Sequence, residues 1–209
     1  MPEFTHIQDD KAQMVDISGK GDVAREAVAA GKIFLREDTL TAIWGGTVIK
    51  GNVLATARVA ATMAVKNTAN LIPMCHPIPI SSVSVDFREG TGYIEAVVTV
   101  KMTGKTGVEM EALTGVSVAL LTIWDMVKSA EKDAQGQYPV TSITDIRVLE
   151  KKKGNNCHDS IAGKGDFVPL DSDPEYATLK KRGAVKEKTI DRNANAISVR
   201  PAKIDTALN

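Results

Sequence analysis

The chain has 209 residues, with 26 basic and 26 acidic side chains and therefore no net charge at neutral pH. Balanced charge gives no overall field that would attract nucleic acid or an anionic membrane, so any anion site must be local. The N-terminus has no apolar leader, and no apolar run approaches the roughly 18 residues that span a bilayer. Only two cysteines are present, which fits a reducing compartment, and we expect a cytoplasmic protein.

The first elements expected along the chain are a short strand at residues 32–36 and a helix that starts near Leu54. The segment after Leu54 is rich in alanine, and Asn52 stands where a side chain would cap the N-terminus of the helix. Prolines follow at positions 73, 77 and 79, and they exclude a helix there. This region therefore predicts an ordered, extended connector.

The next part of the chain alternates between strand and helix patterns. Apolar residues alternate at 83–87 and again at 94–102, around a turn signal at Glu89–Gly92, which predicts a β-hairpin. A long apolar helix follows at Glu109–Lys132, and strand composition returns at 138–150. The order β-α-β-β-α-β predicts an α+β, ferredoxin-like (split βαβ) fold, with an antiparallel sheet and helices packed on one face.

Residues 168–209 differ in composition from the rest of the chain. They carry prolines and mixed charges, and their apolar residues follow no period. We therefore expect one folded domain at residues 1–167, followed by an extension at 168–209 that is either mobile or docked on a neighbouring subunit.

The stretch MTGKTGVEMEALTG, at residues 102–115, contains Gly-Lys-Thr, which is the end of a nucleotide-binding P-loop. A P-loop needs a glycine five residues before that tripeptide, but Thr99 occupies this position, and the preceding strand belongs to a hairpin. A simpler interpretation is that the glycines bend the chain out of the strand and that acidic residues offset the dipole of the following helix.

Charged residues near the two ends of this helix are candidates for a site. Glu109 and Glu111 lie at its start, where carboxylates can hold a polar ligand, and Asp125 and Lys128 form an i, i+3 pair further along. That pair is either a solvated ion pair or a proton-transfer pair. Glu111 and Asp125 are about 21 Å apart along one helix, so we expect two subunits to meet with these helices antiparallel if one site uses both ends.

Further candidates lie outside the helix. Cys75 and His76 are adjacent in an extended segment, so their side chains point to opposite sides and do not have the spacing of a zinc site. A buried thiol with a structural histidine and a ligand-binding role for His76 both remain open. Lys50 precedes a helix N-terminus, and Lys164 is flanked by glycines in AGKGDF; both could bind anions, although Lys164 could equally belong to a flexible surface loop.

Taken together, these motifs resemble one family. The segments THI, MVDIS, KGNVLATARVAA, LIPMCHPIPI, TGKTGVEMEALTGVSVALLTIWDMVKSAEKD and GKGDF are similar, in the same order, to those of the cyclic pyranopterin monophosphate synthases, the MoaC family of molybdenum cofactor biosynthesis. The central two segments are long and specific. The resemblance implies that residues 1–167 form a catalytic domain.

The resemblance also implies a lyase that assembles as a hexamer, a trimer of dimers, with each site shared between two subunits. Its substrate would be 3′,8-cyclo-7,8-dihydroguanosine triphosphate, delivered by a radical SAM enzyme, and its products cyclic pyranopterin monophosphate and pyrophosphate. No cofactor or protein-bound metal is implied, and a magnesium ion on the triphosphate stays open.

By the same resemblance, the candidate residues acquire roles. Asp125, Lys128 and Lys50 match catalytic positions, the first two as a general acid–base pair. The matching substrate-binding positions are Cys75, His76, Glu109, Met110, Glu111 and Lys164. Asn52 stands where the family usually has aspartate, which favours a capping role over a catalytic one.

Two interpretations from other classes compete with the enzyme. A metabolite-binding regulatory module of ferredoxin-like fold would show no turnover and no dependence on Lys128. An RNA-binding domain of similar topology would need a basic face and exposed aromatic residues on its strands, but the hairpin strands offer only Phe87 and Tyr93. We therefore expect no nucleic-acid partner.

Overall fold

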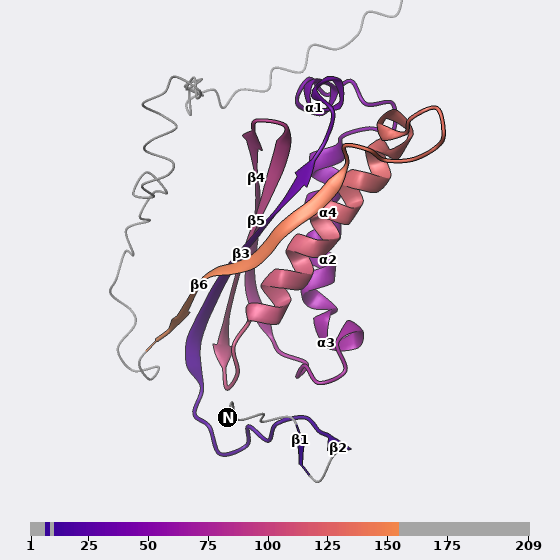
Figure 1. Cartoon of the computed structure of the whole chain (residues 1–209). Helices are drawn as coiled ribbons and strands as arrows, with labels where there is room; N and C mark the ends of the chain where they lie inside the picture. Colours follow the sequence, from indigo (N-terminus) through magenta and orange to yellow (C-terminus); the bar gives the residue numbers. More distant parts are fainter. Residues whose placement is uncertain (1–6, 9–10, 155–209) are drawn as a thin grey trace, which may run out of the picture. The chain divides into compact units, whose positions relative to one another are not determined.

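A four-stranded antiparallel sheet, in the order β4-β5-β3-β6, is the framework of the protein (Figure 1). The computed structural model describes residues 7–8 and 11–154, which belong to one unit. The sheet contains β3 (Val23–Phe34), β4 (Ile80–Gly90), β5 (Tyr93–Gly104) and β6 (Ser142–Lys153). Two short strands, β1 (Ile7–Gln8) and β2 (Lys11–Ala12), pair only with each other.

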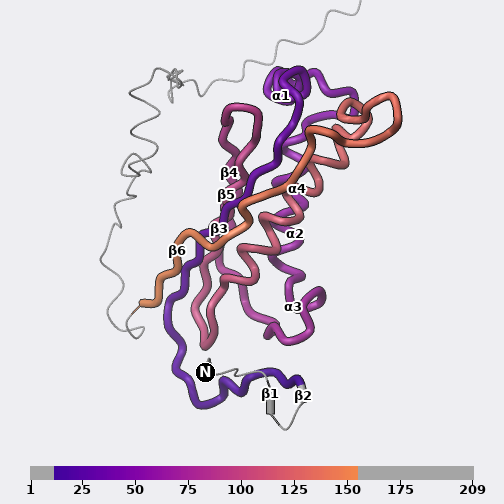
Figure 2. Tube along the Cα trace, viewed as in Figure 1, coloured from indigo at the N-terminus to yellow at the C-terminus, as the bar shows by residue number. Residues whose placement is uncertain are grey.

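Helices cover one face of this sheet. The described helices are α1 (Glu37–Trp44), α2 (Val53–Lys66), α3 (Thr68–Leu71) and α4 (Glu109–Glu131). The two long ones, α2 and α4, lie side by side against the sheet, as the tube in Figure 2 also shows. This strand order and this single helical layer confirm the predicted α+β, ferredoxin-like arrangement.

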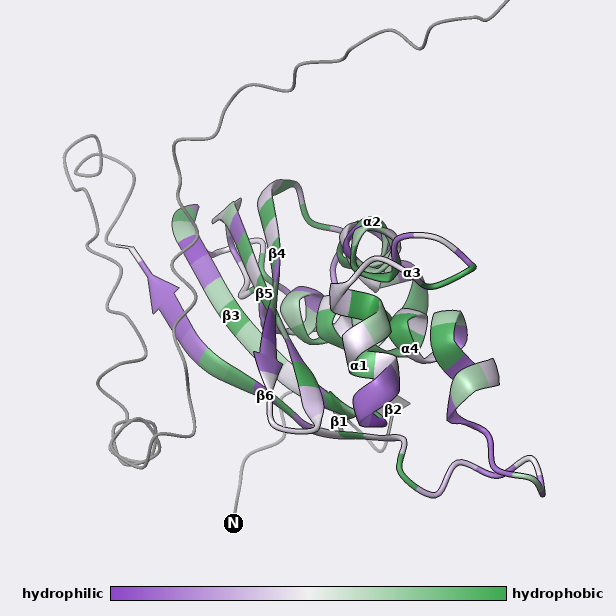
Figure 3. Ribbon diagram, turned by 90° about the horizontal axis from the view of Figure 1, so that it is seen from above, coloured by the Kyte–Doolittle hydropathy of each residue, from purple (hydrophilic) through white to green (hydrophobic). Residues whose placement is uncertain are grey.

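The hydrophobic core lies between the sheet and the two long helices. Alternate residues of β3 and β5, such as Ile33 and Val98, point toward the helices and are fully buried. Leu120 and Ile123 of α4 meet them from the helical side. Figure 3 shows hydrophobic residues, in green, along the strands and along α2 and α4, which lie on one side of the sheet.

Glycine at position 115 allows α4 to pack closely against both of its neighbours. A Cβ atom added at Gly115 would lie 2.8 Å from Cγ2 of Val65 in α2 and 3.1 Å from Cγ1 of Val98 in β5. Because both neighbours are stiff β-branched side chains, a larger residue would push the elements apart.

Several local predictions are confirmed. The turn of the β4–β5 hairpin contains Gly92 at φ 79°, a conformation that favours glycine. The side chain of Asn52 accepts a hydrogen bond from the backbone N–H of Ala55 at 2.9 Å and caps α2 as expected. Helix α4 runs from Glu109 to Glu131, one residue short of the predicted end.

The start of the first long strand was predicted wrongly. Strand β3 begins at Val23 rather than near residue 32, and it ends at Phe34. Its first nine residues, VAREAVAAG, contain good helix formers, yet they pair with β5 on one side and β6 on the other. Pairing along both edges therefore outweighs the local helix preference.

Helix α4 also corrects the expectation that no segment is long and apolar enough to cross a membrane. Its 23 residues meet that requirement by length and composition, the one such helix among the described residues. However, its buried side chains pack against β3, β5 and α2. This is the usual position of a core helix, so the length of α4 is weak evidence for a membrane span.

Candidate active site

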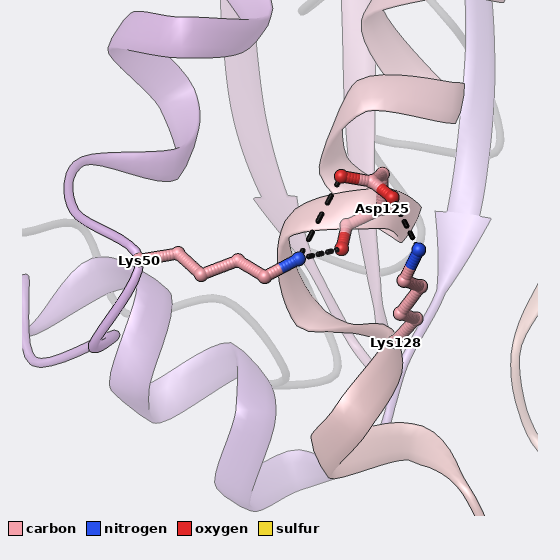
Figure 4. A network of polar contacts seen from close by, with 3 residues as sticks. All are labelled: Lys50, Asp125 and Lys128. Atoms are coloured by element: carbon pink, nitrogen blue, oxygen red, sulfur yellow. Dashed lines mark hydrogen bonds and ion pairs between the residues drawn. The ribbon is translucent and has the colours of Figure 1, made fainter.

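Three charged side chains meet near the C-terminal end of α4, and we call them the lysine cluster: Lys50, Asp125 and Lys128 (Figure 4). Lys128 Nζ donates a hydrogen bond to Oδ1 of Asp125 at 2.7 Å. Lys50 Nζ donates to the main-chain carbonyl oxygen of Asp125 at 2.8 Å and lies 3.6 Å from its Oδ2. One carboxylate is therefore held between two ammonium groups.

The sequence places these groups through two different elements. Asp125 and Lys128 are one turn apart on α4, so their side chains lie on the same face of the helix. Lys50 comes from the connection between α1 and α2, immediately before Gly51, whose φ of 101° suits glycine. The helix N-terminus beside Lys50 adds a partial positive charge, as the sequence predicts.

Mutual attraction fixes the protonation states in the lysine cluster. The hydrogen bond from Lys128, together with its charge and that of Lys50, holds the pKa of Asp125 below its ordinary value. In return, Asp125 raises the pKa of Lys128 above its ordinary value. At neutral pH the single chain therefore holds Asp125 ionised and Lys128 protonated; because both pKa shifts lead away from neutrality, the contact geometry and not the shifts makes this pair a candidate for proton transfer.

The lysine cluster is more open than the apolar sequence around it predicts. The side chains of Asp125 and Lys128 are 61% and 48% exposed in the single chain, although the opposite face of α4 is buried. Leu121, one turn before Asp125, is exposed as well. The face of α4 that carries the cluster is thus open in the single chain.

The other candidates gather at the N-terminal end of α4, around a cavity of about 290 Å³ that we call the carboxylate pocket. Its lining includes all five residues predicted there: Cys75, His76, Glu109, Met110 and Glu111. The α4 residues follow the bend at Gly107, and Cys75 and His76 come from the proline-rich connector between α3 and β4. Sequence order and fold thus bring these five residues to one place.

A segment before β3 closes one side of the carboxylate pocket. Nε2 of His76 lies 2.8 Å from the carbonyl oxygen of Val15. Because a carbonyl oxygen only accepts, Nε2 carries the hydrogen of this contact. The Lys105 ammonium donates to the carbonyl oxygen of Ser18 at 3.0 Å and holds the same segment.

The two carboxyl groups of the pocket differ in environment. Burial raises the pKa of Glu111, which is 4% exposed, and the nearby charge of Glu109 adds to the increase. Burial acts on Glu109 in the same direction, but its hydrogen bond from Lys151 and the surrounding positive charge lower its pKa overall. Burial also raises the pKa of the Cys75 thiol, so this cysteine favours the protonated form.

The structure does not bring the lysine cluster and the carboxylate pocket together within one chain. They lie at opposite ends of the continuous helix α4, as the sequence spacing requires. Within the described part of the chain, no group of three or more His, Cys, Asp or Glu side chains is arranged to hold a metal ion.

Two lysines that sequence analysis did not identify join the carboxylate pocket or its edge. Lys20 lines the pocket, and Lys151 of β6 forms an ion pair with Oε1 of Glu109 at 3.0 Å. Lys20 lies in a Gly-Lys-Gly-Asp segment at 19–22 that recurs at 163–166, and this repetition could have drawn attention to it. Lys164, in the second copy, lies outside the described residues.

Beside Glu109, a second cavity of about 140 Å³ is lined by four cationic side chains and by the carboxylates of Glu26 and Glu109, which pair with two of them. Lys151, Lys152 and Lys153 reach it from β6, and Arg25 from β3. Such a group of positive charges is suited to a polyanion such as a phosphate chain.

Comparison with known proteins finds a matching protein family. A family model described as MoaC family matches residues 14–154. The chain belongs to the MoaC family. This confirms the resemblance inferred from the motifs.

Relatives in the MoaC family are similar over nearly their whole length. A protein from Methanoregula boonei, named probable cyclic pyranopterin monophosphate synthase, is 75% identical over 154 residues, which are 74% of this chain and 99% of the relative. Proteins of the same name from Methanosphaerula palustris and Archaeoglobus fulgidus are 70% and 63% identical over 154 and 152 residues. These two matches cover 74% and 73% of this chain and 100% and 97% of the relatives.

The MoaC match includes both parts of the candidate site. Every candidate residue of the lysine cluster and the carboxylate pocket lies within residues 14–154, as do Lys20 and Lys151. Lys164 lies beyond the matched residues.

Proposed function

We propose that this protein is a cyclic pyranopterin monophosphate synthase, a lyase of molybdenum cofactor biosynthesis. It would convert 3′,8-cyclo-7,8-dihydroguanosine triphosphate into cyclic pyranopterin monophosphate with release of pyrophosphate. The observation that carries this proposal is the lysine cluster, in which a carboxylate and two ammonium groups are in contact. The names of relatives up to 75% identical support the same activity.

The lysine cluster supplies what the reaction needs. Rearranging a purine ring system requires paired proton donors and acceptors, and Lys128 and Asp125 are a protonated donor and an ionised acceptor in contact. Expelling pyrophosphate requires cations that stabilise the developing negative charge, and we assign this role to Lys50, whose ammonium group lies beside Asp125. The radical step precedes this enzyme, in a radical SAM enzyme that delivers the substrate, so we propose no redox cofactor.

The complete site in this proposal contains residues from two subunits. The lysine cluster of one chain would face the carboxylate pocket of its neighbour, because a single α4 holds them about 21 Å apart. The exposed face of α4 around Leu121 supports this, because a second chain would cover it. Following the family resemblance, we propose a hexamer built as a trimer of dimers, located in the cytoplasm.

Substrate binding is assigned to the carboxylate pocket and the cations beside it. Cys75, His76, Glu109, Met110 and Glu111 would hold the ring system, which carries several hydrogen-bonding groups. The triphosphate would bind the cations around Lys151, next to Glu109. Lys164 remains a predicted further ligand of the triphosphate.

The proposal is tested by incubating the purified protein with the cyclised dihydroguanosine triphosphate and measuring pyrophosphate release. Lys128→Ala should reduce turnover about 100-fold or more, as expected for loss of a general acid–base group. Circular dichroism and size-exclusion chromatography serve as controls for folding and assembly of the variant.

The outcomes separate the competing classes of function. Release by the wild type and loss in the variant would support both the reaction and the site. Binding of the substrate without release by the wild type would favour the metabolite-binding module. An RNA-binding role is disfavoured because Phe87 packs against the core rather than standing free on the sheet.

A further inference from the structure

Glu131 has a buried carboxyl group that belongs neither to the lysine cluster nor to the carboxylate pocket. Its side chain is 0% exposed, and it is the last residue of α4, one turn after Lys128. Thr141 Oγ1 donates a hydrogen bond to its Oε2 at 2.6 Å. The backbone N–H of Arg36 donates to both carboxyl oxygens, at 3.2 Å and 3.3 Å. Burial of such a group costs stability unless its oxygens are bonded in this way.

These hydrogen bonds join the ends of three elements. Arg36 lies between β3 and α1 and is the N-cap residue of α1, but its own side chain makes no capping bond. Thr141 is the residue immediately before β6 and is itself buried. One carboxyl group thus ties the end of α4 to the start of α1 and to the start of β6.

One segment of the lysine cluster, the end of α4, finishes at this junction, and the other, which carries Lys50, is connected to it through α1. Asp125 and Lys128 lie within the last two turns of α4, which finishes at Glu131. Lys50 lies in the connection that follows α1, the helix whose first turn is held through Arg36. The contact between Lys50 and Asp125, at 2.8 Å, therefore depends on the relative position of two segments that Glu131 links.

We propose that Glu131 is a positioning residue that fixes the positions of Lys50, Asp125 and Lys128 relative to one another. It acts through hydrogen bonds to Arg36 and Thr141 and does not touch the substrate. This inference rests on the function proposed for the lysine cluster. An error of about 1 Å in such a site can cost about 100-fold in rate, so loss of one anchor should be measurable in turnover.

Two substitutions remove hydrogen bonds that Glu131 accepts, and two conservative ones are chosen to retain them. Glu131→Ala removes all three hydrogen bonds, and Thr141→Val removes one with little change of shape. Glu131→Gln keeps one oxygen, which can still accept from both Thr141 Oγ1 and the Arg36 N–H, and Thr141→Ser keeps the hydroxyl donor, so both should rescue. We expect kcat to fall about tenfold or more in the first two variants, with little change in KM, and to recover in the conservative ones.

A second measurement does not depend on turnover. The side-chain nitrogen resonances of Lys50 and Lys128 report their contacts with Asp125 in the protein without substrate. Both should shift in Glu131→Ala and Thr141→Val, and the pKa of Lys128 should move back toward its ordinary value as its contact with Asp125 loosens. Val116→Ala, which removes buried methyl groups from the middle of α4, is the control for general loss of stability.

The two measurements together decide the inference. If Glu131→Ala and Thr141→Val lose stability as Val116→Ala does but keep the wild-type kcat and lysine resonances, Glu131 is only structural and the inference is overturned. If the wild type shows no turnover, the proposed function fails, yet displaced resonances would still support positioning by Glu131. If Glu131→Ala does not fold, Thr141→Val decides on both measurements.

Discussion

At the scale of single residues, Glu109 and Glu111 show how neighbouring carboxyl groups acquire different properties. They are two positions apart on α4, so their side chains point about 200° apart around the helix axis. Glu109 meets Lys151 of β6 and is the more acidic group, whereas Glu111 points into the interior and is the less acidic one. Groups separated in this way can serve as an anion and a proton donor in one pocket.

Glu111→Gln should make the folded protein more stable at neutral pH and less active. Because burial raises the pKa of Glu111, the folded chain binds this proton more tightly than the unfolded chain. The resulting stabilisation is fully present below the unfolded pKa and is lost as pH rises through the folded pKa. Urea unfolding across about pH 4 to 8 should show a gap between variant and wild type that widens with pH. A constant gap would mean that Glu111 does not titrate in this range.

Most residues of the candidate site could be found from the sequence, because they lie in motifs with local geometry. Asp125 and Lys128 are one helical turn apart, and Glu109 and Glu111 begin a helix after a glycine bend. Lys151 could not be found in this way. It lies in an ordinary strand, and its role depends on β6 lying near the start of α4, a contact between residues 42 positions apart.

At the scale of elements, the position of α4 depends on close packing at its middle. Gly115 is in contact distance of α2 and β5 at once, and Ala112, Val116 and Ala119 of the same helix are fully buried. The helix that carries both parts of the site is therefore held rigidly on two sides.

Gly115→Ala should destabilise the protein although alanine is the better helix former. The gain in helix propensity is about 1 kcal/mol, whereas crowding of Val65 and Val98 should cost about 1–3 kcal/mol. Thermal unfolding should therefore show a lower Tm. Ser129→Ala, at an exposed position of the same helix, is the control and should be neutral or slightly stabilising. An unchanged or higher Tm for Gly115→Ala would show that α2 can move away without cost.

The elements themselves differ in how well their sequences predict them. The hairpin and α4 follow clear periods of two and of about four residues, and both were predicted closely. Helix α1 was not predicted, since its eight residues are too few to show a period. Most of β3, residues 23–31, was missed because its pairing partners are distant in sequence, so only the tertiary structure makes it a strand.

At the scale of the whole molecule, a site shared between subunits predicts complementation between inactive variants. Glu111→Gln and Lys128→Ala damage opposite ends of α4. In a mixed dimer both defects fall on one site and leave the other intact. Random mixing makes about half of the dimers mixed, and each of these has one intact site of two, so about a quarter of wild-type pyrophosphate release should return. The subunits are exchanged by mild denaturation and refolding before assay. If mass spectrometry shows mixed dimers but pyrophosphate release does not recover, the two ends of α4 do not combine into one shared site.

The C-terminal residues provide a second test at this scale. The family match ends at residue 154, and relatives match over nearly their whole length, so a chain ending at Gly154 should keep its fold and its kcat, with KM raised by the loss of Lys164, the predicted further ligand of the triphosphate. Lys151→Ala in this shorter chain should then raise KM because a cation beside Glu109 is lost. If the shorter chain folds but does not turn over, the extension contributes to the site, and Lys164→Ala in the full chain would show whether that lysine is responsible.

The uninterrupted course of α4 has a consequence for how the length of such chains can change in evolution. Inserting or deleting one residue between Glu109 and Lys128 would shift one end of the helix by about 1.5 Å and turn it by about 100° relative to the other. In a symmetric assembly this error would occur in both partners, and each completed site would receive it. Length variation among related sequences should therefore occur in the connection between α4 and β6 and at the chain ends, and not within this helix.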